Sequence, residues 1–301
     1  MSKSYKIALL TIIIFSCTLS QVSAQKIYWS LSNDNNVINK DRAVSRQSFP
    51  KEFKLFALNA NPLSQELSVV TDNQSNHSTI ITLPNADGNL EQFEVVEASN
   101  FEPALQARFP EIRAYSGRGI TDKSAILKLS ISPQGIHTMV FRTDKENEFI
   151  EPYSQDHTVY AVFKSHRQKT GLPWVCSTED QQLVVDLNSR VLNTDNTLSN
   201  TGQLKTMRLA QSCNAEYSNW FGAFNSSQVG LVLAAFNATL TRCNGVYEKD
   251  LGVHLNLIAN TTDVIYYDPA TDPYTNLSSW NLQLQQTLTT VIGNTNYDIG
   301  G

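Results

Sequence analysis

The first half of the chain alternates apolar and polar residues, a pattern typical of half-buried β-strands. Alternating segments lie at 53–58, 79–83, 93–96, 127–131, 136–140 and 158–163. Turn residues at Pro84–Gly88 and at Pro133–Gly135 each separate two of these segments, which predicts two antiparallel hairpins. We expect Asn59–Pro62 to break the first strand and Gly117–Gly119 to form a turn. One short helix is predicted at Pro103–Phe109, because proline suits the first helical turn.

The C-terminal region combines the period of strands with that of helices. Leu204–Ala210 and Val253–Ile258 alternate as strands, and Ser227 is expected to cap a long amphipathic helix between them. The apolar positions of this helix are Val229, Val232, Leu233, Phe236, Leu240, Cys243 and Tyr247. A strand–helix–strand order predicts a parallel pair of strands. A further helix is predicted from Ser279 and is expected to end at Gly293.

A polar segment divides the chain into two predicted domains. Residues 178–203 are rich in Asn, Asp, Ser and Thr and lack an apolar period, which predicts an exposed linker. The fold class is therefore α+β. An antiparallel β-rich domain at 25–177 is followed by an α/β domain at 204–301 that begins with a βαβ unit. Because this second domain would leave a helix face and a strand edge uncovered, we expect it to be incomplete.

Residues 1–24 have the features of a secretory signal peptide. A basic start and an apolar run at 7–15 precede small residues at Val22–Ala24. The protein is therefore expected to be secreted, to the extracellular space or the periplasm. The apolar run is too short to span a membrane, and no other segment is long and apolar enough. Lipidation at Cys17 is the weaker alternative, because the bulky Phe15 does not suit a lipoprotein cleavage site.

Composition limits the partners and the stabilising chemistry. Hydrophobic residues make up 41% of the 301 residues, enough for a sizeable core, and the net charge of −5 argues against nucleic acid as a partner. Beyond the signal peptide the chain keeps Cys176, Cys213 and Cys243, too few for a disulfide scaffold. A Cys213–Cys243 disulfide is not expected, because the helix would run back along its strand and separate the two. Cys243 is expected in the core.

The histidines are not spaced as ligands of a catalytic metal. The chain contains His77, His137, His157, His166 and His254, of which no two lie three to five residues apart, so H-E-x-x-H is absent. His254 is expected to be a hydrogen-bonded residue of a sheet. Asp268 and Asp272 are expected to shape a turn rather than a calcium loop. We therefore assign no catalytic, cofactor-binding or metal-binding residue.

Short motifs in both regions provide a family resemblance. The N-terminal motifs are Leu83–Gly88, Phe93–Glu97, Phe109–Arg113 and Tyr115–Gly117. The C-terminal motifs are Arg208–Ala210, Glu216–Tyr217, Asn244–Asp250, Ala270–Tyr274 and Asn296–Gly300. Together they resemble the propeptide and the start of the catalytic domain of secreted bacterial reprolysin-like zinc metalloproteases, which are metzincins. The motifs are specific in combination, and none of them is catalytic.

The resemblance implies a zymogen with an inhibitory, folding-assisting propeptide, followed by the first part of a protease domain. Members of this family continue with an edge strand and a helix that carries H-E-x-x-H-x-x-G-x-x-H. Three histidines bind zinc there, and the glutamate is the general base for the metal-bound water. Zinc and a protein or peptide substrate are therefore expected for a full-length member, whereas this chain, truncated before that helix, is expected to bind no zinc.

Three residues are candidates for roles in zymogen maturation. Cys176 could act as a cysteine switch whose thiolate fills the open zinc position, although Ser177 stands where glycine is common. The favoured alternative is a partly buried cysteine beside Trp174. Arg190 and Lys205 are candidate cleavage sites, because basic side chains in a polar segment suit trypsin-like enzymes.

Two functions without catalysis remain open. A secreted, propeptide-like module that binds a partner protein is suggested by the strand edge that we expect to be uncovered. A β-rich surface or adhesion protein is the weaker of the two.

Overall fold

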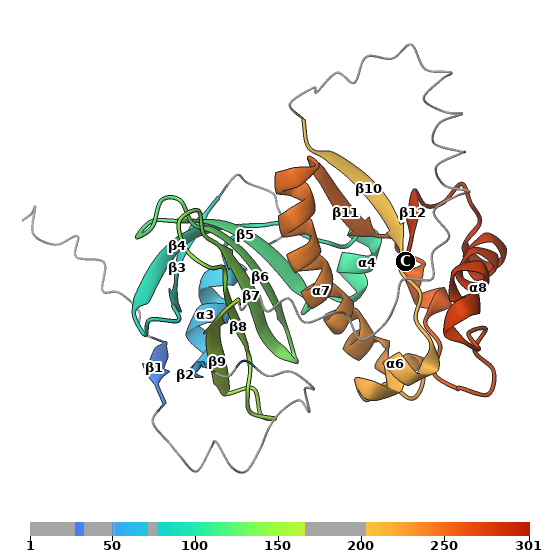
Figure 1. Cartoon of the computed structure of the whole chain (residues 1–301), viewed down its shortest axis with the longest axis horizontal. Coiled ribbons are helices and arrows are strands. Elements are labelled where there is room, and N and C mark those ends of the chain that lie inside the picture. The colour runs from blue at the N-terminus through green and yellow to red at the C-terminus, as the bar shows by residue number, and fades with distance from the viewer. Residues whose placement is uncertain (1–27, 33–49, 51, 72–76, 166–202) are drawn as a thin grey trace, which may run out of the picture.

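The computed structural model describes residues 28–32, 50, 52–71, 77–165 and 203–301. They form two regions that lie side by side: an N-terminal region (28–165) around a large antiparallel sheet, and a C-terminal region (203–301) around a small parallel sheet (Figure 1). This mixture of helices and strands agrees with the α+β expectation. The expected signal peptide and all but one residue of the expected linker lie outside the described residues. Within the described ranges, no helix is both long and apolar enough to cross a membrane.

The larger sheet has nine strands in the described residues, and all neighbouring strands are antiparallel. Its spatial order is β1-β2-β9-β8-β7-β6-β5-β4-β3. The strands are β1 (Trp29–Leu31), β2 (Lys54–Leu58), β3 (Thr79–Pro84), β4 (Leu90–Glu97), β5 (Arg113–Gly119), β6 (Ile126–Ser132), β7 (Gly135–Phe141), β8 (Glu148–Pro152) and β9 (Val159–Lys164). Both predicted hairpins, β3–β4 and β6–β7, are confirmed.

The turn predicted at Gly117–Gly119 is wrong, because these residues lie inside β5. A Cβ on Gly117 would lie 2.7 Å from Val95 Cγ1, and one on Gly119 would lie 1.9 Å from the Asp122 carbonyl oxygen. Glycine therefore serves here to let neighbouring chain approach the strand closely.

The break predicted at Asn59–Pro62 is confirmed, since β2 ends at Leu58, but helix α3 (Ala60–Ser68), which begins there, is not predicted. Pro62 lies in the first turn, where its missing N–H costs no helical hydrogen bond. Leu63 and Leu67 of this helix are buried in the core of the large sheet. The sheet curls around α3 (Figure 1), and the Trp29 indole in β1 donates a 2.9 Å hydrogen bond to the Thr82 carbonyl in β3.

The smaller sheet has the spatial order β11-β10-β12, and its strands are parallel. The main elements of this region are β10 (Lys205–Ala210), α6 (Ala215–Trp220), α7 (Val229–Asp250), β11 (Val253–Leu257), α8 (Trp280–Thr287) and β12 (Ile299–Gly300). Short helical turns lie at Ser226–Gln228, Thr261–Val264, Leu277–Ser279 and Leu288–Ile292. The predicted βαβ unit is confirmed, since β10 and β11 flank α7 in the chain and pair in parallel.

Asparagine and glycine residues mark where the helical segments of the C-terminal region begin and end. The cap predicted at Ser227 is wrong, because α7 begins at Val229 and its N-cap residue, Gln228, makes no side-chain capping bond. Asn225 instead caps the preceding turn Ser226–Gln228, where its side-chain oxygen accepts a 3.0 Å hydrogen bond from the Ser227 backbone N–H. Gly252 follows α7 with φ +64°, and Gly293 follows the last helical turn with φ +84°. Both values lie in the left-handed region that favours glycine, so the helix end predicted at Gly293 is confirmed and Gly252 ends α7 in the same way.

Helix α7 lies between the two sheets (Figure 1) and packs against β5, β6 and β7 on one side and against β11 on the other. The approach to the large sheet is close: a Cβ on Gly245 would lie 2.6 Å from Phe141 Cε2 and 2.9 Å from Lys128 Cγ. The short helix α4 (Pro103–Arg108) makes a second contact between the two regions. It belongs to the N-terminal region and lies on the side that faces the small sheet.

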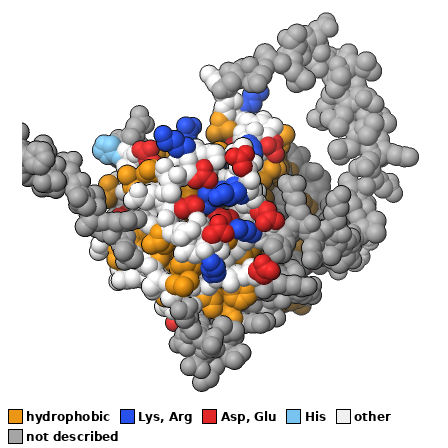
Figure 2. Space-filling model, turned by 60° about the vertical axis from the view of Figure 1, so that its left-hand side comes forward, with side chains coloured by type: hydrophobic (Ala, Val, Ile, Leu, Met, Phe, Trp, Pro, Cys, Tyr) orange, Lys and Arg blue, Asp and Glu red, His pale blue; other side chains and the backbone are white. Residues whose placement is uncertain are grey.

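Acidic and basic side chains lie interspersed on the face of the molecule that Figure 2 presents. The ion pairs of the N-terminal region include exposed Lys164–Asp87 at 2.6 Å and buried Arg142, whose guanidinium lies 2.6 Å from Glu91 and 2.9 Å from Asp122.

Candidate functional site

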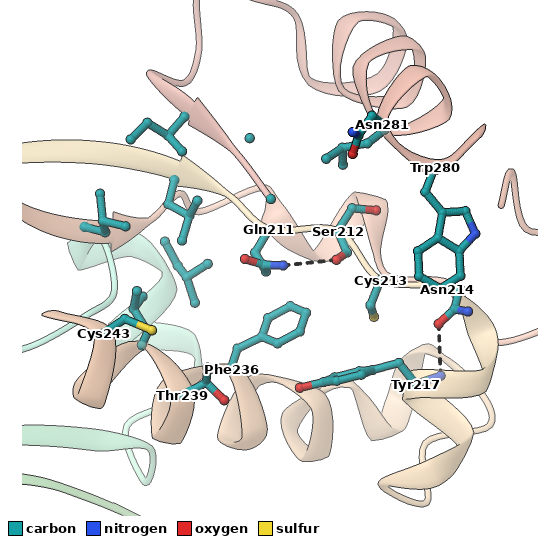
Figure 3. Close-up of a pocket in the computed structure, with 18 of the residues that line it drawn as sticks. Gln211, Ser212, Cys213, Asn214, Tyr217, Phe236, Thr239, Cys243, Trp280 and Asn281 are labelled. Carbon is teal, nitrogen blue, oxygen red and sulfur yellow. Dashed lines mark hydrogen bonds between the residues drawn. The ribbon is translucent and has the colours of Figure 1, made fainter. Parts of the chain in front are cut away.

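The candidate site is an apolar cavity of about 680 Å³ within the C-terminal region. Its wall is formed by the small parallel sheet, α6, α7 and α8. Leu209, Leu255 and Ile299 come from the three strands, and Phe236 and Leu240 come from α7. Figure 3 shows Trp280 and Asn281 of α8 at the far side of the cavity from Phe236.

The strand and helix periods explain why this wall is apolar. Leu255 and Leu257 are two residues apart in β11 and point to the same side of the sheet. Phe236, Leu240 and Cys243 follow at intervals of four and three along α7 and share one helix face. These two apolar faces meet in one core cluster and continue as the wall of the cavity.

Several polar side chains at the cavity already have structural partners. The Ser212 hydroxyl donates to the Val264 carbonyl at 2.7 Å and lies 2.6 Å from the Tyr274 hydroxyl. Asn214 accepts the Tyr217 backbone N–H at 3.1 Å and thereby caps α6, and the Gln211 amide donates to the Ser212 carbonyl at 3.3 Å (Figure 3). These groups shape the cavity, whereas the rest of its wall suits an apolar occupant.

Two free thiols, Cys213 and Cys243, line the cavity. They lie apart in Figure 3, so the expected absence of a disulfide between them agrees with the structure. Cys243, expected in the core, is only partly buried and contributes to the cavity wall. Burial raises the pKa of Cys213 to about 11, although a hydrogen bond with Ser218 opposes the shift. Because burial also raises the pKa of Cys243, both thiols stay protonated near neutral pH and are poor nucleophiles.

His254 has the structural environment that the sequence predicts. Its Nδ1 lies 2.7 Å from Glu248 Oε1, and its Nε2 lies 3.1 Å from the Ser99 carbonyl and 3.0 Å from Asn256 Oδ1. Both ring nitrogens are therefore used within the fold, and this histidine is a hydrogen-bonded residue of the sheet.

The two aspartates of the 268–272 segment are turn residues, as predicted. Asp268 accepts the Ala270 N–H at 2.9 Å. Asp272 accepts the N–H groups of Ala215 and Tyr274, each at 2.9 Å, and so fixes this segment against the start of α6.

The described residues do not fit a catalytic zinc ion. No group of three His, Cys, Asp or Glu side chains in the described ranges could hold a metal. A zinc site needs at least three such ligands around one point. We therefore derive no catalytic step from a metal in this chain.

The maturation candidates are placed only in part. Cys176 and Arg190 lie outside the described residues. Lys205 is exposed and begins β10, where its backbone N–H donates to the Gly252 carbonyl at 2.9 Å. Cleavage at Lys205 stays a prediction, and it would require this end of β10 to open.

The sequence pattern does not reveal the cavity, because its wall is assembled from segments far apart in the chain. Helix α6 and its Tyr217, which covers one end, are not predicted. The one feature of the sequence that could have revealed the cavity is the apolar stripe of α7. This stripe is longer than the sheet that it packs on, so part of it must face something else.

Comparison with protein families adds one finding. Residues 203–301 match the model of a family described as metallo-peptidase family M12B, reprolysin-like. Comparison with curated proteins gave no match. The matched segment is the C-terminal region with its parallel sheet, α7 and the cavity. Family M12B is generally zinc-dependent, and a peptidase family implies protein substrates. The match therefore supports a metalloprotease-family function, of the reprolysin-like kind, for the region that contains the cavity.

Proposed function

We propose that this chain is the N-terminal portion of a secreted metalloendopeptidase zymogen. Residues 25–177 would be the propeptide, and residues 204–301 would form the first part of the peptidase domain. The observation that carries the proposal is that the family match coincides with a parallel βαβ sheet. A match over loops alone would not have this weight.

The cavity gives the proposal a structural consequence. A sheet face beside a packed helix is best covered by another helix, because helices and sheets bury their apolar sides against each other. The apolar wall formed by α7 and the three strands would therefore take the zinc-binding helix of the peptidase domain. The Ser212 and Asn214 side chains, which line the cavity, are already paired and would not hinder an apolar helix face.

The test is to read the coding sequence in frame beyond codon 301. We expect it to encode H-E-x-x-H on an amphipathic helix. A stop codon directly after residue 301, together with a stable secreted product, would contradict the proposal.

A secreted protein-binding module without catalysis is the second candidate. It is favoured by the cavity itself, whose wall is mostly apolar and whose Ser212 and Asn214 side chains are engaged in the fold. Such a surface suits binding better than acid–base chemistry. The reading-frame test separates the two candidates.

A further inference from the structure

The N-terminal region contributes side chains to the core of the C-terminal region. Phe101, Leu105 and Ile112 are 3%, 0% and 0% exposed and belong to the same core cluster as Leu233 and Leu257. They come from α4 and the residues beside it. Separation of the two regions would return these apolar side chains to water, which is unfavourable.

The same segment extends the small sheet. Phe101 bridges Leu257 in parallel, the Leu257 N–H donates to the Asn100 carbonyl at 2.7 Å, and the Glu102 N–H donates to the Leu257 carbonyl at 2.9 Å. The sequence predicts an uncovered strand edge in the C-terminal region, but at β11 the edge is paired by residues 100–102 of the N-terminal region. Addition of a strand to a sheet edge is a common way to bind an extended segment.

A buried amide network joins the two regions beside this strand. The Asn100 amide donates to Asn237 Oδ1 at 2.9 Å and to Thr241 Oγ1 at 2.8 Å. The Asn244 amide donates to Asn100 Oδ1 at 2.9 Å, and the Asn237 amide donates to the Arg113 carbonyl at 2.9 Å. Asn100, Asn237 and Asn244 are 2%, 1% and 1% exposed. Because buried amides are costly when unpaired, this network is satisfied only while the regions are together.

Charged groups surround the network. Lys128 of β6 pairs with Glu248 of α7, and Arg242 of α7 lies 2.8 Å from Glu151 of β8. At the other end, Glu102 accepts the Ala259 N–H at 2.9 Å. Oppositely charged groups thus face each other across the contact, which fixes the register of the two regions.

We propose that residues 99–113 are a permanent clamp, through which the N-terminal region remains bound to the C-terminal region after the chain between them is cut. The complex is held by the shared apolar core, the added strand and the amide network, and it needs no covalent connection. The clamp is independent of peptidase activity and goes beyond the function proposed above.

The clamp also leaves the cavity free. Asn237, Thr241 and Asn244 lie along one stripe of α7, and Phe236, Leu240 and Cys243, which line the cavity, lie along the neighbouring stripe. Helix α7 can therefore bind the N-terminal region while another occupant fills the cavity.

The experiment uses the full secreted chain with the recognition sequence of a site-specific protease inserted after Thr194. After complete cleavage, gel filtration under native conditions should give one peak that contains both fragments, also on dilution. Two separate peaks of folded fragments would overturn the proposal. This readout does not depend on peptidase activity. The clamp can therefore be refuted while the proposed function stands, and the proposed function can be refuted while the clamp stands.

Variants identify the clamp. The double substitution N237A and N244A should weaken the association of the cleaved fragments about tenfold or more. It removes the Asn237 acceptor of the Asn100 amide, the Asn244 donor to Asn100 Oδ1 and the Asn237 donor to the Arg113 carbonyl. The matched control is Asn85→Ala, a buried asparagine bonded at 2.8 Å to Glu91 within the N-terminal region, which should leave the association unchanged. Equal weakening by both would contradict the role of the network. If the double variant does not fold, elution of the cleaved parent protein still decides the proposal.

Discussion

The burial of Cys213 lowers the reactivity of its thiol. It lies at the cavity wall, yet burial raises its pKa to about 11, and the hydrogen bond with Ser218 does not offset this. A thiol reacts as the thiolate. Geometric access alone therefore does not make it a reactive group.

We expect Cys213 to react slowly with iodoacetamide at pH 8 in the folded chain. Peptide mapping by mass spectrometry measures the modification and separates Cys213 from Cys176 and Cys243. The same reaction in urea is the control, because unfolding removes the burial. Equal rates in the folded and unfolded chains would show that the thiol is not protected.

The Glu248 carboxylate connects the two regions, because it contacts Lys128 of the N-terminal region and His254 of the C-terminal region. Burial alone would raise its pKa, but hydrogen bonds from His254 of β11 and Lys128 of β6 outweigh it and hold the pKa below its usual value. A carboxylate with a lowered folded-state pKa stabilises the fold above its unfolded-state pKa, and the contribution is lost as the pH falls through the lowered value. The contact should therefore weaken in acid.

Glu248→Gln should reduce the loss of stability between pH 6 and pH 3. The substitution removes the ionisable group that Lys128 and His254 stabilise, so the variant is less stable at pH 6 and more similar to the parent at pH 3. Urea midpoints across this range measure the effect. Glu111→Gln, an exposed carboxylate, is the control. A parallel pH dependence of parent and E248Q would contradict the assignment.

At the scale of elements, α7 organises both regions because it packs on two sheets at once. Its approach to β6 and β7 depends on Gly245, where a Cβ would lie 2.6 Å from Phe141. Gly230 in the same helix has room, since a Cβ there would lie 3.8 Å from Phe109. The two glycines therefore form a matched pair.

Gly245→Ala should destabilise the protein by about 1–3 kcal/mol, the usual cost of overpacking a core. Gly230→Ala should be neutral or slightly stabilising, because alanine favours helix and meets only ordinary contacts. Thermal or urea unfolding of both variants measures the difference. Equal effects of both substitutions would contradict the close packing at Gly245.

The elements that the sequence predicts are those whose periodicity comes from local burial. The β6–β7 hairpin and the βαβ unit have clear apolar alternation and clear turn residues, and both are present. Strand β8 lacks this signal because Glu148 and Glu151, each 4% exposed, are buried as ion pairs, Glu148 with the nearby Arg142 and Glu151 with Arg242, which is distant in sequence. Long-range pairing of this kind leaves no local pattern. The cavity depends on the same long-range assembly, so only its α7 stripe was predictable.

At the scale of the whole molecule, the family match covers the C-terminal region, while the N-terminal region completes its core and pairs its sheet edge. The molecule is therefore one assembly in which a large antiparallel sheet supports a peptidase-like βαβ unit. The central claim is that this unit is the first part of a metallopeptidase domain.

Casein hydrolysis tests this claim most directly, with the 301-residue chain and the same chain extended by its in-frame coding sequence measured side by side. We predict that the extended protein, once cut in its linker, cleaves casein and loses this activity with a chelator. The 301-residue chain, in which no two histidines have ligand spacing, should show neither cleavage nor stoichiometric zinc by elemental analysis. Chelator-sensitive cleavage by the 301-residue chain, or an extended protein that is inactive although it contains H-E-x-x-H and is folded, would contradict the account.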